Sequence, residues 1–289
     1  MVDSPIVITG ASGFLGSALV SAVQQRGWPV IGVTRFPQER RRASGQVVWM
    51  SWEEVPHVIA KSRAVIHVAT SYGRNESEES IREAIIELPL KLARVAAMDG
   101  VPFLSADTFF RILPQPYEYL RTYTDAKQVF RDQMQLLAQG AIPAPFLIIY
   151  HMVGPGDRTD KSLPALVRRI VQDQGRLALT DGTQVRDFIH VNDVASAFIS
   201  VLEGIASFPN GVVDIPVGSG VLTCWRDVLV QVHQLAKSSI ELGFGDIPRR
   251  CGEPDIEAAD QAILRQLGWR PQYLLEDALR SMILEVSRE

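Results

Sequence analysis

The first half of the chain alternates short, continuous apolar runs with longer segments whose apolar residues recur at the period of an α-helix. The short runs predict buried strands at residues 6–9, 30–33, 47–49, 64–69, 101–105 and 145–150. The longer segments predict helices at residues 14–26, about 77–98 and about 123–139, and Pro89 should kink the second of these. This alternation is typical of a mostly parallel sheet that is covered by helices on both faces.

The pattern changes after His151, where loops and shorter segments begin. Strands are expected at residues 185–190 and 212–217. Helices are expected at residues 162–173, 192–202, 223–235, 255–267 and 275–285. These elements predict a smaller, mixed α/β C-terminal part that caps the carboxyl ends of the sheet strands, where open α/β sheets bind their ligands.

The composition narrows the class of protein. Of the 289 residues, 46% are hydrophobic and 21% are charged, which excludes disorder as the dominant state. The net charge of −4 argues against a nucleic-acid-binding surface. No apolar stretch approaches the ~18 residues that cross a membrane, and the N-terminus lacks the basic region of a signal peptide. We therefore expect a cytoplasmic protein with neither nucleic acid nor membrane as a partner.

The cysteines and histidines do not suggest a metal centre. The two cysteines, Cys224 and Cys251, cannot form a disulfide framework and have no metal-ligand spacing. The five histidines include no zinc motif. His67 and His190 lie in apolar strands, so we interpret both as core residues rather than catalysts.

A glycine-rich turn follows the first predicted strand and opens the first predicted helix. The segment Thr9–Gly16 reads TGASGFLG, one residue longer in its glycine spacing than the usual Rossmann fingerprint. Glycines let the backbone approach a pyrophosphate, and the start of a helix supplies N–H donors and the positive end of a dipole. We therefore favour dinucleotide binding over a purely structural turn, and we predict an α/β fold with a doubly wound Rossmann sheet.

The end of the second predicted strand favours NADP over NAD. NAD-binding sites usually carry an acidic residue here for the ribose 2′-hydroxyl, but this chain has Thr34 and Arg35, followed by arginines at 40, 41 and 42. A guanidinium at this position suits a 2′-phosphate. The alternative interpretation is a solvated basic loop.

Tyr123 and Lys127 are four residues apart in a predicted helix, so they share one face. A free tyrosine has a pKa near 10 and is a poor acid–base catalyst at neutral pH. A neighbouring Lys⁺ favours the phenolate and brings the pKa closer to the working range. The spacing alone is common on helix surfaces, but its combination with the N-terminal glycine turn predicts a catalytic pair.

Six segments, in this order, make the whole chain similar to the extended short-chain dehydrogenase/reductases, which include nucleotide-sugar epimerases, dehydratases and ketoreductases. They are TGASGFLG at 9–16, VIHVAT at 65–70, YTDAK at 123–127, VGPGD at 153–157, RDFIHVNDVASA at 186–197 and LGWRP at 267–271. The segments LSADTFF, HMVGPGD and LTDGTQVRDFIHVNDV most resemble the branch that reduces CDP-linked 4-keto-6-deoxy sugars. The resemblance implies that residues 1–150, with about 185–212, form an NADP-binding Rossmann domain, and that residues 151–184 and 213–289 form a nucleotide-sugar-binding part.

The resemblance also implies roles for single residues. Tyr123 would be the catalytic acid/base, and Lys127 would hold the nicotinamide ribose and tune Tyr123. Arg35 would meet the adenosine 2′-phosphate. The other cofactor-binding candidates are Gly10, Ser12, Gly13, Phe14, Leu15, Gly16, Ala69 and Thr70. The substrate-binding candidates are Arg186 and Arg250 for the phosphates, His151 near the diphosphate and Glu253 for the nucleotide ribose. Arg186 could instead be a structural ion-pair partner.

The chain departs from the family pattern at Ala106, where the third catalytic residue is normally Ser or Thr. Losing a hydroxyl that hydrogen-bonds the reacting oxygen should lower the rate. Either a neighbour replaces it or the chain is catalytically weak. Strand alternation turns Ser105 away from position 106, so we expect Asp107 or Thr108 to complete the catalytic set.

These observations lead to an NADPH-dependent reductase of a nucleotide-linked 4-keto-6-deoxy sugar, with Tyr123 as the proton donor. The alternatives are a redox-neutral nucleotide-sugar epimerase or dehydratase that retains NAD(P), and a non-catalytic NADP-binding protein. The family resemblance further implies a homodimer formed through the long helices at 77–98 and 122–139. On the residues alone, packing against the sheet explains their apolar faces equally well.

Overall fold

A computed structural model describes residues 4–41, 47–71 and 77–288, so Arg42 of the predicted basic loop lies outside the described residues. Contacts between residues divide the chain into two compact units. Unit 1 contains residues 1–149, 195–216 and 262–270, and unit 2 contains residues 150–194, 217–261 and 271–289. Residues 185–194, which we expected in the NADP-binding domain, cluster with unit 2. No helix in the described part of the chain is long and apolar enough to cross a membrane.

Unit 1 is built on a seven-stranded sheet with the order β10-β6-β5-β4-β1-β2-β3. Five neighbouring pairs, β1–β2, β1–β4, β2–β3, β4–β5 and β5–β6, are parallel. This is the order of a Rossmann sheet, so the predicted fold class is confirmed. The strands are β1 Ile6–Thr9, β2 Val30–Val33, β3 Val47–Met50, β4 Ala64–His67, β5 Phe103–Thr108, β6 Pro143–Ile149 and β10 Gly211–Val217.

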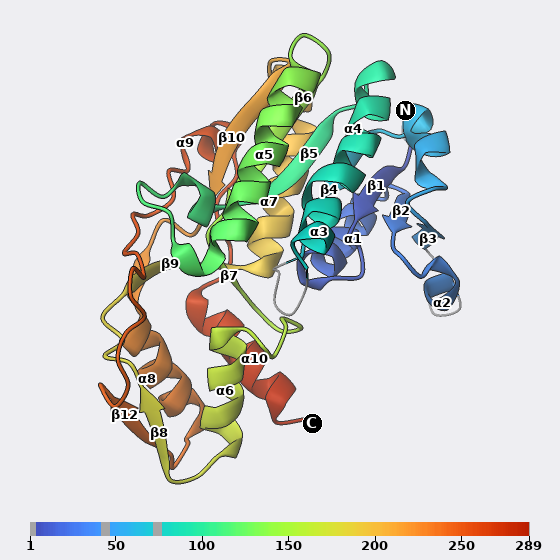
Figure 1. Ribbon diagram of the computed structural model, residues 1–289. Helices are drawn as coiled ribbons and strands as arrows, with labels where there is room; N and C mark the ends of the chain where they lie inside the picture. The colour runs from blue at the N-terminus through green and yellow to red at the C-terminus, as the bar shows by residue number, and fades with distance from the viewer. Residues whose placement is uncertain (1–3, 42–46, 72–76, 289) are drawn as a thin grey trace. The chain divides into compact units, whose positions relative to one another are not determined.

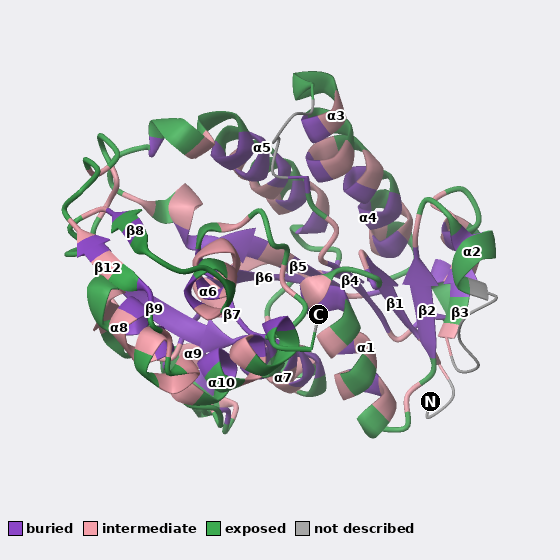
Figure 2. Ribbon diagram, turned by 90° about the horizontal axis from the view of Figure 1, so that it is seen from below, coloured by how far each residue is buried: buried purple, intermediate pink, exposed green. Residues whose placement is uncertain are grey.

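Helices cover both faces of this sheet, as Figures 1 and 2 show. One face carries α3 (Glu78–Arg82), α4 (Leu88–Met98) and α5 (Arg121–Ala138), and the other carries α1 (Phe14–Gln25) and α7 (Val191–Glu203). The inner strands are buried along their length, which is why they are continuously apolar in sequence. The short helices α2 (Pro37–Arg41) and α9 (Ala262–Gln266) complete the unit.

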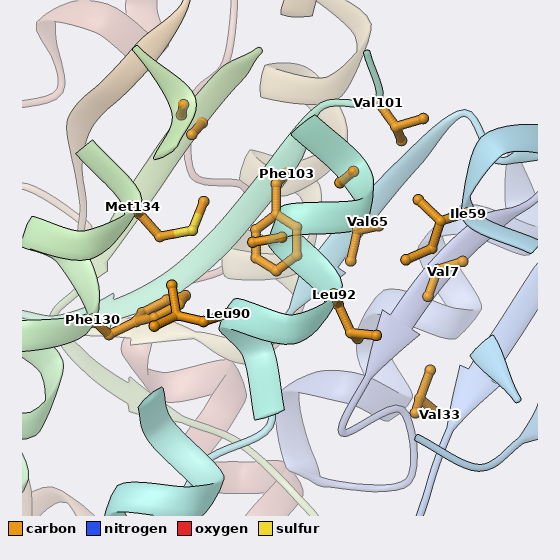
Figure 3. Packing of buried hydrophobic residues seen from close by; sticks show 14 of the residues in the cluster. Val7, Val33, Ile59, Val65, Leu90, Leu92, Val101, Phe103, Phe130 and Met134 are labelled. Atoms are coloured by element: carbon orange, nitrogen blue, oxygen red, sulfur yellow. The ribbon is translucent and has the colours of Figure 1, made fainter. Parts of the chain in front are cut away.

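The core on the α4/α5 face fixes the position of α5, which carries the predicted catalytic pair. Figure 3 shows Phe103 of β5 among Val65, Leu92, Phe130 and Met134. Phe103, Phe130 and Met134 have no exposed surface. Burying a side chain of this size contributes roughly 1.5–3 kcal/mol. The strand and the helix that carry the predicted catalytic residues are therefore held together directly.

Pro89 interrupts the long helix, as the sequence predicted. The segment Glu83–Glu87, immediately before α4, is π-helical, and Pro89 lies in the first turn of α4. Proline has no N–H for the helical ladder, and a π turn accommodates the resulting break.

Unit 2 has two small sheets and three helices. The strands β11 (Leu222–Cys224), β9 (Val185–His190) and β7 (His151–Val153) form one sheet, and β12 (Glu241–Phe244) pairs with β8 (Arg176–Leu179). The helices α6 (Ser162–Gln172), α8 (Trp225–Ala236) and α10 (Leu275–Val286) share a core that includes Val167, Val232 and Leu279. The sequence did not predict β7, β8 or β12, because strands of three or four residues carry little periodic signal.

The predicted helix at 255–267 is wrong for its first half, since only Ala262–Gln266 is helical. The buried carboxylate of Asp187 holds the preceding segment by accepting the Ala259 N–H at 3.0 Å. The same carboxylate accepts N–H groups from Ser219 at 2.7 Å and Gly220 at 3.0 Å. These tertiary hydrogen bonds override the local helix preference of residues 255–261.

Candidate functional site

The candidate residues fall into two groups, one in each unit. Unit 1 contains the glycine turn, the end of β2 and the Tyr123–Lys127 pair. Unit 2 contains His151, Arg186, Arg250 and Glu253.

The glycine turn has the backbone that the sequence predicts. Gly10 has φ +69°, and a Cβ there would lie 2.8 Å from the Cα of Ala69. A Cβ on Gly16 would lie 1.9 Å from the carbonyl oxygen of Gly10. Glycine is therefore required at Gly10 by conformation and at Gly16 by close approach. The turn also brings Ala69, a predicted cofactor neighbour, against Gly10.

The start of α1 fits an anionic ligand. Gly13 is the N-cap, has no side chain to cap the helix, and no acidic residue lies in the first turn. Ser12 and Gly13 are exposed, Phe14 is half-buried, and Leu15 is buried. A helix N-terminus without a capping side chain offers N–H groups and a positive dipole end to a phosphate. The turn and this helix start therefore fit the diphosphate of a dinucleotide.

The end of β2 presents basic side chains. Arg35 and Arg40 are exposed, and the Thr34 hydroxyl accepts the Phe36 N–H at 3.4 Å. Thr70 is also exposed, whereas Ala69 is half-buried. The arrangement leaves Arg35 available for a 2′-phosphate.

Tyr123 and Lys127 lie on the inner face of α5. Tyr123 is 7% exposed and Lys127 is 2% exposed. The Lys127 Nζ lies 6.0 Å from the centre of the Tyr123 ring and donates a hydrogen bond to the Ala106 carbonyl oxygen at 2.9 Å. Burial lowers the pKa of Lys127, and Arg111 lowers it further, while Asp107 opposes the shift. The pair is thus buried, close together and anchored to β5.

β5 continues to Thr108, three residues beyond the predicted end, so the segment that replaces the missing hydroxyl is part of the strand. Ser105 has no exposed surface, and its hydroxyl has no hydrogen-bond partner among the described residues. Strand alternation puts Asp107 on the same face as Ser105, and Thr108 on the face of Ala106. The alternation that turns Ser105 away from position 106 therefore turns Asp107 away as well.

Asp107 and Thr108, the two candidates to replace the hydroxyl missing at Ala106, have different surroundings. The carboxylate of Asp107 accepts the Thr108 N–H at 2.8 Å and the Arg111 Nε–H at 2.5 Å. Burial raises the pKa of Asp107, and the neighbouring cations Arg111 and Lys127 oppose the rise. The Thr108 hydroxyl accepts the Phe110 N–H at 3.3 Å, which leaves its own proton for donation.

Arg111 is a residue that the sequence analysis missed. Its side chain is only 6% exposed, and it bonds to Asp107, to Gln128 and to Asp214. Arg131 also contacts both oxygens of Asp214 at 3.0 Å. The only local signal was the spacing of four between Asp107 and Arg111, because Asp214 is 103 residues away.

His67 is a core residue, as expected, but only one of its two ring nitrogens has a hydrogen-bond partner among the described residues. Its Nδ1 pairs with the Thr9 hydroxyl at 2.8 Å, while Nε2 has no partner among the described residues. The ring packs against Phe103 and Phe130. Burial, and then the charge of Lys127, holds the pKa of His67 well below its usual value.

In unit 2, two of the substrate candidates bond to each other. The Arg186 side chain, 3% exposed, donates from Nη2 to Glu253 at 2.8 Å. Its Nη1 donates to the carbonyl oxygens of Val185 and Pro254, both at 2.7 Å. Arg186 and Glu253 therefore lie together, and the ion-pair role that we considered for Arg186 is present.

The other two candidates differ in exposure. His151 is half-buried and packs against Phe188, and burial followed by the charge of Arg186 lowers its pKa to about 3. It is therefore neutral at physiological pH, as an asparagine would be. Arg250 is exposed.

The chain is similar in sequence to known enzymes. The chain is 29% identical to the CDP-abequose synthase of Salmonella typhimurium over 290 residues, which cover 96% of this chain and 97% of that protein. The enzyme of the same name from Salmonella muenchen is 26% identical and covers 98% of both chains.

Solved structures show the same fold. MoeE5 in complex with UDP-glucuronic acid and NAD superposes with a TM-score of 0.82 at 22% identity, covering 99% of both chains. The UDP-glucuronic acid 4-epimerase from Bacillus cereus, with UDP-glucuronic acid and NAD, gives 0.83 at 19% identity, covering 98% of this chain and 99% of that one.

The model of the NAD dependent epimerase/dehydratase family matches residues 6–215, which hold the glycine turn, the Tyr123–Lys127 pair and Arg186. The chain therefore belongs to this family, as an NAD(P)-dependent enzyme of the extended short-chain dehydrogenase/reductase type.

Proposed function

We propose that this enzyme uses NADPH to reduce the keto group of a nucleotide-linked 4-keto-6-deoxy sugar. The observation that carries the proposal is the buried Tyr123–Lys127 pair, anchored to β5 through Ala106, in a chain that aligns end to end with CDP-abequose synthases. A keto sugar needs a proton on its oxygen as it is reduced, and this pair can supply one.

The glycine turn and Arg35 support the choice of cofactor. Gly10, Gly13 and Gly16 would admit the diphosphate at the start of α1, with Ser12, Phe14 and Leu15 beside it and with Ala69 and Thr70 next to the turn. The exposed Arg35 would bind the 2′-phosphate that distinguishes NADP from NAD. When bound, NADPH supplies the hydride for the reduction.

Tyr123 would donate its phenol proton to the keto oxygen. The ammonium of Lys127 would hold the nicotinamide ribose and favour the phenolate that remains on Tyr123. Since Lys127 is nearly fully buried, its charge acts through a medium of low polarity and has a stronger effect than it would have in water.

Thr108 is the better of the two candidates for the hydroxyl missing at Ala106. It shares a strand face with Ala106 and keeps a proton to donate, whereas Asp107 would first have to leave Arg111. We therefore assign Thr108 to the reacting oxygen, and Asp107 remains a candidate only if its ion pair opens.

The substrate would be held by unit 2. Arg186 and Arg250 would bind the diphosphate, Glu253 the nucleotide ribose, and neutral His151 would donate or accept a hydrogen bond near the diphosphate. The buried guanidinium of Arg186 supports this role, because charge-assisted bonds to phosphate are strong where water is scarce.

A redox-neutral epimerase with retained NAD is the second candidate. The likeness in fold to the UDP-glucuronic acid 4-epimerase from Bacillus cereus favours it. The two functions differ in cofactor balance, because a reductase consumes NADPH and an epimerase does not.

We also propose a homodimer that works in the cytoplasm. The exposed side chains of Met98 on α4 and of Val129 and Leu136 on α5 support the dimer. Light scattering of the wild type and of Leu136→Glu tests it, since the variant should be a monomer if these helices pair.

The deciding experiment measures NADPH oxidation with CDP-, dTDP-, GDP- and UDP-linked 4-keto-6-deoxyhexoses, with NADH in parallel. Turnover of one of these substrates with NADPH supports the reductase. Tyr123→Phe should then lower the rate by about 100-fold or more while NADPH still binds. The exposed Tyr119→Phe is the matched control. Saturable NADPH binding without turnover of any substrate would overturn the proposal.

A further inference from the structure

The Arg111 guanidinium is buried, so its partners must satisfy it. With a side chain only 6% exposed, it uses Nε for Asp107 at 2.5 Å, Nη1 for Gln128 at 3.1 Å and Nη2 for Asp214 at 3.4 Å. A buried cation is costly unless it is paired and hydrogen-bonded. Arg111 therefore belongs to a defined network and is not a surface ion pair.

The partners of Arg111 belong to three different elements. Asp107 is on β5, Gln128 is on α5, and Asp214 is on β10. The planar guanidinium directs its donors in a fixed fork, so one side chain fixes the relative position of all three elements.

Two of these partners, Asp107 and Gln128, directly follow in sequence the two residues that form a hydrogen bond in the predicted catalytic centre. Asp107 directly follows Ala106, whose carbonyl oxygen accepts the Lys127 ammonium at 2.9 Å. Gln128 directly follows Lys127. Arg111 therefore holds the residue next to the acceptor and the residue next to the donor.

We propose that Arg111 is a positioning residue that holds Lys127 against the Ala106 carbonyl oxygen by joining Asp107 to Gln128. Its nearly full burial leaves it no access to substrate, so it acts through Lys127. Asp107 then serves as the anchor of Arg111 on β5. This inference rests on the proposed function for its link to catalysis, but not for its link to the position of Lys127.

The chain offers a matched control. Arg131 also bonds to Asp214 but to neither Asp107 nor Gln128. Arg131→Met removes an ion pair from the same carboxylate and leaves both anchors beside Lys127. Arg111→Met removes the hydrogen bonds to Asp107, Gln128 and Asp214 together. Gln128→Met removes only the bond between Arg111 and α5 and leaves the Arg111–Asp107 ion pair. It therefore tests the proposal even if Arg111→Met does not fold.

The first measurement needs no substrate. A hydrogen-bonded, buried lysine ammonium gives a protected ¹H–¹⁵N signal, which is assigned to Lys127 with Lys127→Met. We expect this signal to shift or to be lost through solvent exchange in Arg111→Met and Gln128→Met, and to persist in Arg131→Met. A signal unchanged in Gln128→Met overturns the proposal, even if the wild type reduces none of the sugars.

The second measurement is the single-turnover rate of NADPH oxidation. Misplacing a catalytic group costs about 10- to 100-fold, so we expect that loss in Gln128→Met and Arg111→Met, with a smaller change in KM than in kcat. Arg111→Lys should recover part of the rate, because an ammonium keeps the charge but not the fork. Equal losses in Arg131→Met, or an altered Lys127 signal with an unchanged rate, would overturn the positioning role.

Discussion

At the scale of single residues, the end of β5 contains the neighbours that are candidates to replace the hydroxyl missing at Ala106. Ala106 removes the usual donor, Ser105 is enclosed on the opposite face, and Asp107 is held by Arg111. Thr108 is left with a hydroxyl proton on the face that Ala106 shares. Position on the strand face therefore decides which neighbour can take over the role.

Thr108→Val tests this replacement. If the Thr108 hydroxyl stabilises the reacting oxygen, the substitution should lower kcat by about 100-fold, the loss typical for one such donor. Ala106→Ser in the Thr108→Val background should restore part of the rate by returning a hydroxyl to its usual position. Single-turnover NADPH oxidation measures both, and a Thr108→Val enzyme with wild-type kcat would remove Thr108 from the catalytic set.

The proposed preference for NADP depends on one side chain, that of Arg35. Arg35→Ala should raise KM for NADPH by about 10- to 100-fold, because a charge-assisted hydrogen bond contributes about 1.5–3 kcal/mol. KM for NADH should stay the same, since NADH lacks the 2′-phosphate. Arg40→Ala is the control on the same exposed stretch, and steady-state kinetics with both cofactors gives the comparison. Equal effects on NADH and NADPH would count against the 2′-phosphate role.

At the scale of elements, sequence predicted best where the signal is local. The runs at Ile6–Thr9 and Val30–Val33 are strands with the predicted bounds, because continuous apolar residues report burial directly. The strand Val185–His190 also has the predicted bounds, although it contains Arg186 and Asp187. The sequence could not predict β8 and β12, whose strand pairing joins residues far apart in the chain. The sequence also did not predict the Arg111 network, because Asp214 on β10 is 103 residues away from Arg111 in the chain.

The segment 255–261 is the clearest failure, and it yields an element-scale prediction. Asp187→Ala should lower the free energy of unfolding by about 3–5 kcal/mol, because it leaves the buried N–H group of Ala259 and the partly buried N–H groups of Ser219 and Gly220 without their acceptor. Hydrogen exchange at the Ala259 amide should accelerate strongly. The exposed Asp227→Ala is the control, and urea unfolding measures both variants. A loss no larger than that of Asp227→Ala would mean that other contacts hold residues 255–261.

At the scale of the whole molecule, several buried histidines make stability depend on pH. The pKa values of His67, His151 and His190 are all lowered, with burial as the largest cause, and that of His151 is about 3. A histidine in the unfolded chain takes up a proton below its ordinary pKa of 6.5, whereas these three take up a proton only at a lower pH in the folded protein. Stability should therefore be full above pH 6.5 and fall as pH drops below it. The raised pKa of Asp107 acts in the opposite direction, at lower pH.

His151→Asn isolates one of these contributions. Its urea midpoint should fall less than that of the wild type between about pH 7 and pH 5, because asparagine takes up no proton. If His151→Asn follows the wild-type slope, folding does not lower the pKa of His151.

The division of the chain has a consequence for its synthesis. Unit 1 is assembled from residues 1–149, 195–216 and 262–270, so the chain passes between the units after residues 149, 194, 216, 261 and 270. Asp214 and the indole of Trp269, which donates to Ser196 at 2.8 Å, belong to the later stretches. A nascent chain that has just completed β6 at Ile149 must wait for about 65 more residues before Asp214 and most of β10 are made, on the order of several seconds at typical ribosome speeds. Until then Arg111 lacks its Asp214 partner and β6 its β10 neighbour. The nascent chain thus has a vulnerable interval in which chaperones or premature aggregation can act on an open sheet edge.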